Sequence, residues 1–266
     1  MCSRIHSLTK STLLLGGGGG GLANTYCADF GGGYLEAATS ADHSYNGNTD
    51  PPNPGASISF SLWVYLGTTA DQTLISKFGG VDGYVLAIAG DELNFSIWDQ
   101  PVSSDDGLWY KTNNTPLVTG AWQHIVAIFD NPRASPVGLA RIYVDGVDTN
   151  AVVDATYDRF LGNAYTATKF RLGSRGAGTA GIVYSGLMDE VSIWSKALTA
   201  GEVATIFAAG DPFADEQTAD LTGESGLESW YRFKATDDFT GTAGGIEDEL
   251  GNSDLTAGGT VTSVAV

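Results

Sequence analysis

Two neighbouring acidic residues, Asp189 and Glu190, are the first candidates for catalysis in this sequence. A pair of carboxylates on either side of a glycosidic bond can act as acid and base or as acid and nucleophile. The pair lies in a strand-like segment, residues 186–194, and adjacent residues of a strand point to opposite faces of a sheet. We therefore expect that the two carboxylates cannot flank one bond and that the protein is not an enzyme.

Other reactive residue types occur without the spacing that their chemistry needs. Cys2 and Cys27 do not form a Cys-x-x-Cys motif, and the six glycines at 16–21 lack the Lys-Ser/Thr ending of a phosphate-binding loop. No Ser/His/Asp or Cys/His arrangement stands out. We expect His124 to form a hydrogen bond on a strand surface, and we predict no metal and no cofactor.

Three aromatic residues are the candidates for ligand binding. Trp98, Trp109 and Tyr110 lie in or beside the polar stretch 99–115. Exposed aromatic rings are large, rigid and apolar, with a polar tip, so they could stack on sugar rings. The alternative is that these rings pack beneath a loop.

The charge of the chain excludes two classes of partner. The 266 residues include 31 acidic and 13 basic side chains, for a net charge of −18. A field of this sign repels nucleic-acid phosphates and anionic lipid surfaces. No apolar run approaches the length of a membrane span. We therefore expect neither nucleic acid nor a membrane as a partner.

The first 24 residues differ from the rest of the chain. Leu13, Leu14 and Leu15 follow basic residues but run directly into the glycines at 16–21. A signal peptide needs an apolar region of about 7–15 residues, so this segment is too short to be one. We interpret residues 1–24 as a flexible arm whose three leucines dock on a partner.

Most of the remaining sequence predicts short antiparallel strands. Ile58, Phe60, Leu62, Val64 and Leu66 alternate with Ser and aromatic residues, which indicates one buried face. Further strand-like runs are 73–77, 84–89, 92–99, 122–130, 140–145, 169–173 and 187–194. Many short strands separated by glycine turns are typical of a β-sandwich.

One turn and one helix have specific local signals. Asp145-Gly146 stands between two strand-like runs, and both residue types tolerate the positive φ of a tight hairpin turn. Thr199 and Glu202 have the spacing of a capping box, and apolar residues follow at 203–207. The sequence therefore predicts a hairpin at 145–146 and one short helix docked on the sandwich.

Three regions follow from this pattern. We predict the arm at 1–24, an all-β antiparallel jelly roll at 25–210, and an acidic extension at 211–266 that adds strands to the sandwich. The extension carries 12 acidic side chains against Arg232 and Lys234. It is too poor in apolar residues to form a second core of its own.

The order of the strand segments resembles the laminin-G-like and concanavalin A-like jelly rolls, a superfamily that includes the pentraxins. The matching segments, in order, are 57–63, 83–88, 119–126, 141–147, 170–173, 186–194 and 196–203. The resemblance covers residues 26–210 and implies calcium in the loop after Gly173. Here that loop, 174–179, has an arginine and no carboxylate. Calcium needs several charged oxygens, so we expect this site to be lost.

The arm and the jelly roll together are similar to bacteriophage virion proteins. This resemblance implies a non-catalytic virion structural protein, decorating a capsid or forming part of a fibre. Its partners would be capsid or other virion proteins, bound by the arm. Each particle would carry many copies of the protein or a homo-oligomer of it. A secreted or cell-surface adhesin that binds host glycans is one alternative, and a β-glucanase-like hydrolase is another.

Overall fold

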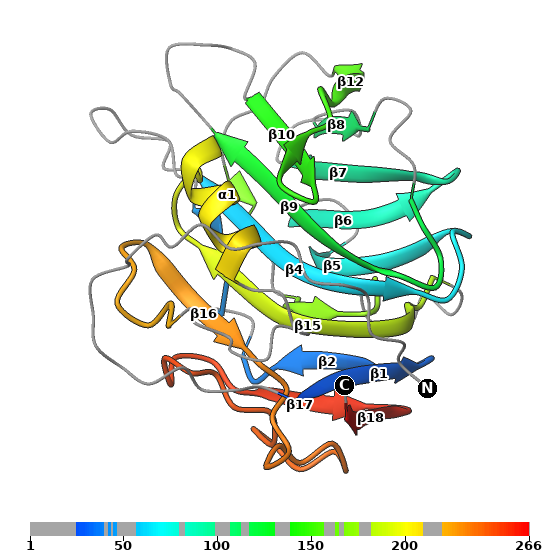
Figure 1. Ribbon diagram of the computed structural model, residues 1–266, viewed down its shortest axis with the longest axis vertical. Coiled ribbons are helices and arrows are strands. Elements are labelled where there is room, and N and C mark those ends of the chain that lie inside the picture. Colours follow the sequence, from blue (N-terminus) through cyan, green and yellow to red (C-terminus); the bar gives the residue numbers. More distant parts are fainter. Residues whose placement is uncertain are drawn as a thin grey trace.

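The chain forms two eight-stranded antiparallel sheets that lie face to face (Figure 1). The computed structural model describes residues 25–39, 42–43, 45–46, 57–79, 83–98, 107–112, 117–130, 139–156, 163–164, 168–175, 182–209 and 220–265. Within these ranges there is one helix, α1 (Ala200–Ala209), which lies against the sandwich. This arrangement confirms the predicted jelly roll. Leu13, Leu14 and Leu15 of the predicted arm lie outside the described residues.

Sheet A has the order β11-β10-β9-β4-β15-β1-β18, and β16 also pairs with β15. Its strands are β1 (Tyr26–Gly31), β4 (Ile58–Leu66), β9 (Trp122–Asp130), β10 (Leu139–Val144), β11 (Val147–Asp148), β15 (Ser185–Trp194), β16 (Leu227–Tyr231) and β18 (Val261–Ala265).

Sheet B has the order β12-β8-β7-β6-β5-β14-β2-β17. Its strands are β2 (Tyr34–Ala37), β5 (Gln72–Phe78), β6 (Gly83–Ala89), β7 (Glu92–Trp98), β8 (Gly107–Lys111), β12 (Val152–Thr156), β14 (Arg171–Leu172) and β17 (Leu255–Gly258). A separate pair joins β3 (Tyr45–Asn46) and β13 (Asn163–Ala164).

The core lies between the two sheets and takes every second residue of most strands. In β4 the side chains of Phe60, Leu62 and Val64 enter it, as the alternating sequence predicts, and all three are fully buried. Phe95 on β7 enters from the opposite sheet, and its ring centroid lies 6.0 Å from that of Phe60. Truncating such a buried phenylalanine to alanine typically costs about 3–5 kcal/mol.

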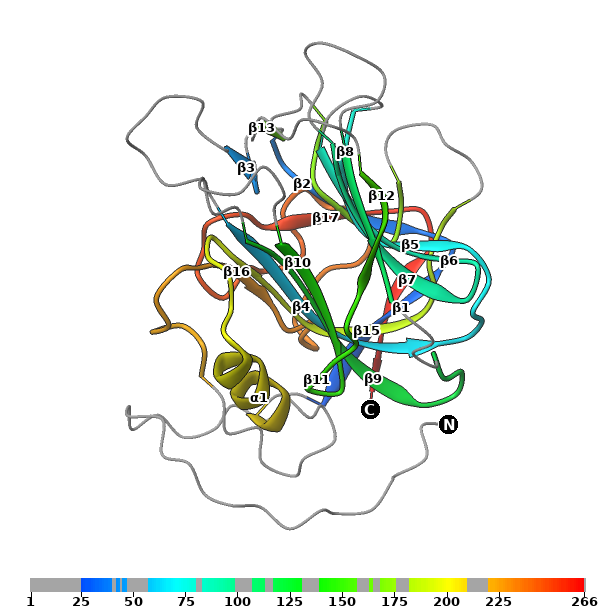
Figure 2. The ribbon, with the colours of Figure 1, turned by 90° about the horizontal axis from the view of Figure 1, so that it is seen from above.

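A second apolar cluster covers the outer face of sheet A. Figure 2 shows α1 on the side of sheet A that faces away from sheet B. Val203 and Ile206 of the helix pack there with Trp194 of β15 and Trp230 of β16. Both faces of the middle of sheet A are therefore buried. This burial explains why Ser59, at a polar position of β4, is inaccessible and donates a hydrogen bond to the Lys196 carbonyl at 2.7 Å.

The start of α1 has the predicted capping box. The Glu202 N–H donates to Thr199 Oγ1 at 3.3 Å, and the Thr199 N–H donates to Glu202 Oε2 at 2.7 Å. Each side chain satisfies a backbone donor that the first turn leaves open. Among the described residues, no helix is both long and apolar enough to cross a membrane.

The last described segment contributes strands at three places. β16 pairs with β15, β17 with β2, and β18 with β1. Asp248 is 1% exposed and fixes the connection after β16. Its carboxylate accepts hydrogen bonds from Ser229 Oγ, the Trp230 N–H and the Ser253 N–H at 2.7, 2.9 and 3.1 Å.

The Asp145-Gly146 turn joins β10 and β11 as predicted, with φ of 51° and 76°. A Cβ on Gly146 would lie 2.9 Å from Cδ1 of Phe207 on α1. Gly146 therefore meets two requirements, a left-handed backbone and close approach of the helix.

We expect Gly146→Ala to lower the free energy of unfolding by more than the roughly 1–2 kcal/mol of left-handed strain alone. Gly90→Ala separates the two causes, because Gly90 has φ of 61° but open space around its Cβ position. Gly223→Ala, in open space without a positive φ, serves as the neutral control. Urea denaturation measures all three, and an equal loss for Gly146→Ala and Gly90→Ala would show that the helix contact adds nothing.

Candidate functional site

The outer face of sheet B gathers aromatic side chains from three strands. Ile97 and Tyr110 enter the core, so their neighbours Trp98 and Trp109 point outward. Phe78 of β5 and Trp98 of β7 both pair with Gly83 of β6, which lies between them. Because Gly83 has no side chain, the two rings meet across it, with centroids 5.6 Å apart.

Three rings and one cation form a continuous group. We call this group the aromatic cluster, and its members are Phe78, Trp98, Trp109 and Arg175. The Trp98 and Trp109 centroids lie 5.0 Å apart with the planes at 62°. The Arg175 guanidinium carbon lies 4.7 Å from the centroid of the Phe78 ring. A cation over a ring face is attracted by the ring quadrupole, so this contact holds Arg175 at the cluster.

Both indole N–H groups of the cluster lack an acceptor. Trp98 and Trp109 are each half-buried, and their Nε1 atoms are buried without a hydrogen-bond partner. A buried donor without a partner costs roughly 1–3 kcal/mol. Two such donors side by side on a half-buried aromatic surface are chemically suited to hydroxyl acceptors.

A charged group occupies the same face of sheet B toward β2. Arg171 Nε and Nη2 donate to Glu36 Oε2 at 2.8 and 2.6 Å, and Lys169 Nζ donates to Glu36 Oε1 at 2.9 Å. Burial alone would raise the pKa of Glu36, but the hydrogen bonds from Lys169 and Arg171 outweigh it and hold that pKa below its usual 4.5. The face therefore has an aromatic part and a charged part.

The structure brings together two of the three aromatic residues selected from sequence. Tyr110 was the exception, because alternation along β8 sends it into the core, where it is 4% exposed. Burial raises the pKa of its phenol. Sequence reasoning did not select Phe78 or Arg175. Phe78 could have been found from the alternation along β5, but its contact with Trp98 depends on how three strands align.

The expectation that Asp189 and Glu190 point to opposite faces was wrong. The register of β15 shifts between Asp189 and Ser192, and Glu190 has φ of 49°. Met188 and Val191 both enter the core, so this β-bulge leaves the two acids between them outside it. A bulge inserts an extra residue, which breaks the alternation on which the expectation rested.

Both acids are nevertheless buried at the junction with β16. Asp189 is 0% and Glu190 7% exposed. Glu190 accepts hydrogen bonds from Trp230 Nε1 at 2.7 Å and from Arg232 Nε at 3.1 Å. Burial, with a smaller contribution from the charge of Glu190, raises the pKa of Asp189 well above its usual 3.8.

His124 lies beneath α1. Its Nε2 is 2.8 Å from Ser61 Oγ, and its ring stacks with that of Phe207 at a centroid distance of 5.6 Å. The side chain is 1% exposed, and burial lowers its pKa from 6.5 to about 3. Among the described residues, no group of three or more His, Cys, Asp or Glu side chains could hold a metal ion.

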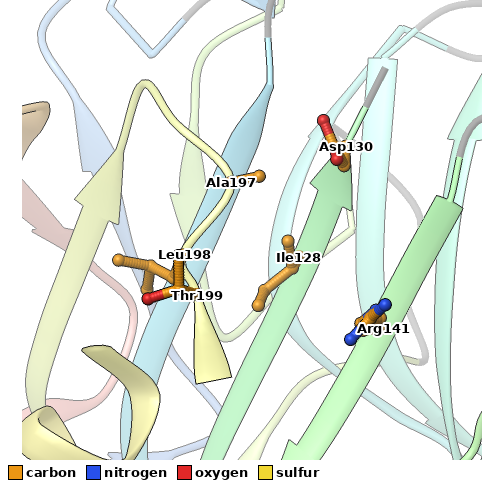
Figure 3. Close-up of a pocket in the computed structure, with 6 residues that line it drawn as sticks. All are labelled: Ile128, Asp130, Arg141, Ala197, Leu198 and Thr199. Atoms are coloured by element: carbon orange, nitrogen blue, oxygen red, sulfur yellow. The ribbon is translucent and has the colours of Figure 1, made fainter. Parts of the chain in front are cut away.

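A hollow lies on the outer face of sheet A (Figure 3). Ile128 and Asp130 on β9, Arg141 on β10 and the segment 197–199 before α1 line it. Its volume is about 200 Å³. Ligand pockets usually have about 300–1,000 Å³, so the hollow is small for a ligand, and the outer face of sheet B is the stronger candidate site.

The two sheets, the closing helix and the strand order define a concanavalin A-like jelly roll. Residues 37–204 match the sequence model of the concanavalin A-like lectin/glucanases superfamily, Laminin_G_3. The chain therefore belongs to this superfamily. No curated protein matches the sequence.

Two solved structures share the fold. One is a candidate carbohydrate-binding protein from Bacteroides ovatus ATCC 8483, with a TM-score of 0.63 and 20% identity over 92% of this chain. The chain spans 61% of the length of that protein. The other is the heptameric SAP-like pentraxin from Limulus polyphemus, with a TM-score of 0.54 and 12% identity over 91% of this chain and 96% of the pentraxin chain.

The burial of His124 generates a pH-dependent stability. The folded state keeps this imidazole neutral down to a pH of about 3, whereas the unfolded chain takes up the proton near pH 6.5. The unfolded state therefore binds more protons in this window, and stability falls as the pH falls. We expect His124→Gln to lower stability at pH 7 but to flatten its decline by about 1 kcal/mol per pH unit between pH 6 and 5.

Chemical denaturation at several pH values measures the decline for both proteins. The variant should keep part of the slope, because burial also lowers the pKa of His43 to about 4. Identical slopes in the wild type and the variant would contradict a neutral buried His124.

Proposed function

We propose that this protein is a non-catalytic glycan-binding module whose ligand lies on the outer face of sheet B. The observation that carries the proposal is the aromatic cluster, in which Trp98, Trp109 and Phe78 meet on one surface and two buried indole N–H groups have no acceptor. A sugar presents an apolar face of C–H groups and a rim of hydroxyls. Half-buried aromatic rings match the first, and the indole N–H groups match the second.

The shape of the sandwich supports this location. Figure 2 places α1 on the far side of sheet A, and the second apolar cluster occupies the outer face there. On sheet B, the side chains between the aromatic and the charged parts are small: Ser76, Val85 and Ser96. These three side chains are buried, and Ser76 donates a hydrogen bond to the Ser174 carbonyl at 2.6 Å. The half-buried rings beside them are therefore the accessible part of this face.

The comparisons agree with this proposal. The superfamily is named for lectins and glucanases, and the Bacteroides ovatus neighbour is described as carbohydrate-binding. At 20% identity the neighbour supports the fold, and the aromatic cluster supplies the argument for the ligand.

The absence of catalysis is part of the proposal. Asp189 and Glu190 lie under β16, and Glu190 is committed to Trp230 and Arg232. An acid pair that acts on a glycosidic bond must touch the substrate. We therefore expect no release of reducing sugar from β-glucans by the purified protein, and measurable release would contradict this part of the proposal.

A virion role remains a separate prediction. It depends on residues 1–24, outside the described part of the chain. Mass spectrometry of purified particles tests it directly. Deleting residues 1–24 should abolish attachment to particles while sheets A and B stay folded, and retained attachment would count against the arm.

Replacing one ring of the cluster tests glycan binding. We expect the wild type to bind a defined subset of a broad glycan array, and Trp109→Ala to weaken the best hit at least tenfold, about 1.4 kcal/mol. Trp122→Ala is the matched control, because Trp122 is a half-buried tryptophan on the outer face of sheet A, beside Tyr65. Isothermal titration calorimetry gives the affinities, and circular dichroism checks the fold. Silence of the wild type on the array, or equal affinity of Trp109→Ala, would overturn the proposal.

A further inference from the structure

The aromatic cluster and the charged group lie on one continuous row of outward side chains. Arg171 on β14 pairs with Ser76 on β5, Ser76 with Val85, Val85 with Ser96, and Ser96 with Trp109. Each step crosses one strand. At about 4.8 Å per strand, the four steps from Arg171 to Trp109 span roughly 19 Å. The three side chains in the middle of the row are buried.

Phe78 connects the two parts of the row. It follows Ser76 by two residues on the same face of β5, and Ser76 pairs with Arg171 on the neighbouring strand. On its other side, the Phe78 ring contacts that of Trp98. A sugar stacked at Phe78 or Trp98 would therefore have a substituent within reach of the Arg171 guanidinium.

The guanidinium of Arg171 is only partly used. Its Nε and Nη2 both donate to one oxygen, Glu36 Oε2, while Nη1 is buried without a partner. The residue as a whole is 8% exposed, and its guanidinium carbon lies 5.2 Å from the Tyr34 ring centroid. A guanidinium has five N–H donors. The edge formed by Nη1 and the second N–H of Nη2 therefore has donors for two parallel hydrogen bonds, although Nη1 is buried.

Positive charge is in excess around this edge. Lys169 and Arg171 both contact the carboxylate of Glu36, so two cations face one carboxylate here. The chain as a whole has a net charge of −18. A local excess of cations on a strongly acidic protein selects for an anionic ligand group at this place.

We propose that the glycan bound on sheet B is an acidic saccharide, with a sugar ring on the aromatic cluster and a carboxylate on the Nη1–Nη2 edge of Arg171. This inference rests on the proposed glycan binding and adds the chemical class of the ligand. A carboxylate has two coplanar oxygens, which match the planar fork of a guanidinium in a bidentate pair. Nη1 is shielded from solvent, so this pairing involves local side-chain movement.

Matched saccharides test the proposal on the unaltered chain. The probes are oligogalacturonate, oligoalginate and oligoglucuronate, each paired with its carboxyl-reduced form of the same length, together with dextran sulfate. At 0.15 M salt we expect at least one uronate to bind tenfold or more tightly than its carboxyl-reduced form in calorimetric titrations. Dextran sulfate should bind more weakly than that uronate.

Two substitutions test the role of the open edge. Arg171→Lys keeps the charge but loses the planar fork, and it should weaken the acidic probe about tenfold while leaving the reduced probe unchanged. Glu36→Gln removes the competing carboxylate and should strengthen binding of the acidic probe several-fold. Arg141→Lys, an exposed arginine on the opposite sheet, is the control and should change neither affinity.

The outcomes separate this inference from the proposed function. Suppose that the acidic and reduced probes bind with equal affinity and that Trp109→Ala loses both. This result would overturn the proposal of an acidic ligand and keep the proposal of glycan binding. Tighter binding of dextran sulfate than of every uronate would overturn the assignment of a carboxylate as the ligand group at Arg171. A weaker acidic complex in Glu36→Gln would overturn the role of Arg171. A failure of every probe and of the glycan array would overturn both proposals.

Discussion

The alternation of side chains along each strand is the constraint on which the rest of this structure depends. The core between the sheets accepts every second residue, so what enters it determines what appears outside. Ile97 and Tyr110 fill the core, and Trp98 and Trp109 stand on the outer face as a result. A register slip of one residue would exchange these roles, turning tryptophans inward and core residues outward. The proposed binding surface is therefore specified by the same packing that stabilises the sandwich.

The two outer faces of the sandwich are used differently. On sheet A, α1 and β16 bury Trp194 and Trp230 and enclose His124, Asp189 and Glu190. Residue types that are often catalytic are thereby placed where they contribute to packing and to buried hydrogen bonds. On sheet B, the outward side chains include aromatic rings, small residues and the ion-paired Glu36, Lys169 and Arg171. This asymmetry is why we place the proposed binding site on sheet B.

Much of the fold could be predicted from the sequence, because its signals are local. The alternation in β4, the Asp145-Gly146 turn and the Thr199–Glu202 capping box each depend on residues close in the chain. The candidate site was harder to predict. Trp98 and Trp109 were selected, but Tyr110 was selected with them although it directly follows Trp109, and alternation alone would have excluded it.

The remaining site residues could not be derived in this way. The bulge at Glu190 changes the face of a single residue, although the spacing of Met188 and Val191 carries a weak signal of it. The contacts of Phe78 with Trp98, and of Arg171 with Glu36, need the alignment of strands that are distant in sequence. Such contacts are properties of the assembled sheets and leave no mark in a local pattern.

The pairing of the first and last strands has a consequence for how the chain reaches this structure. Tyr26 of β1 aligns with Ala265 of β18, and Tyr34 of β2 aligns with Gly258 of β17. The other neighbours of β1 and β2 are β15 and β14, so every pairing of these two strands joins segments that are distant in the sequence. Pairing over such separations requires closing a very long loop, which makes folding slow and leaves strand edges open to other chains in the meantime. Slow pairing of this kind favours association between partly folded copies.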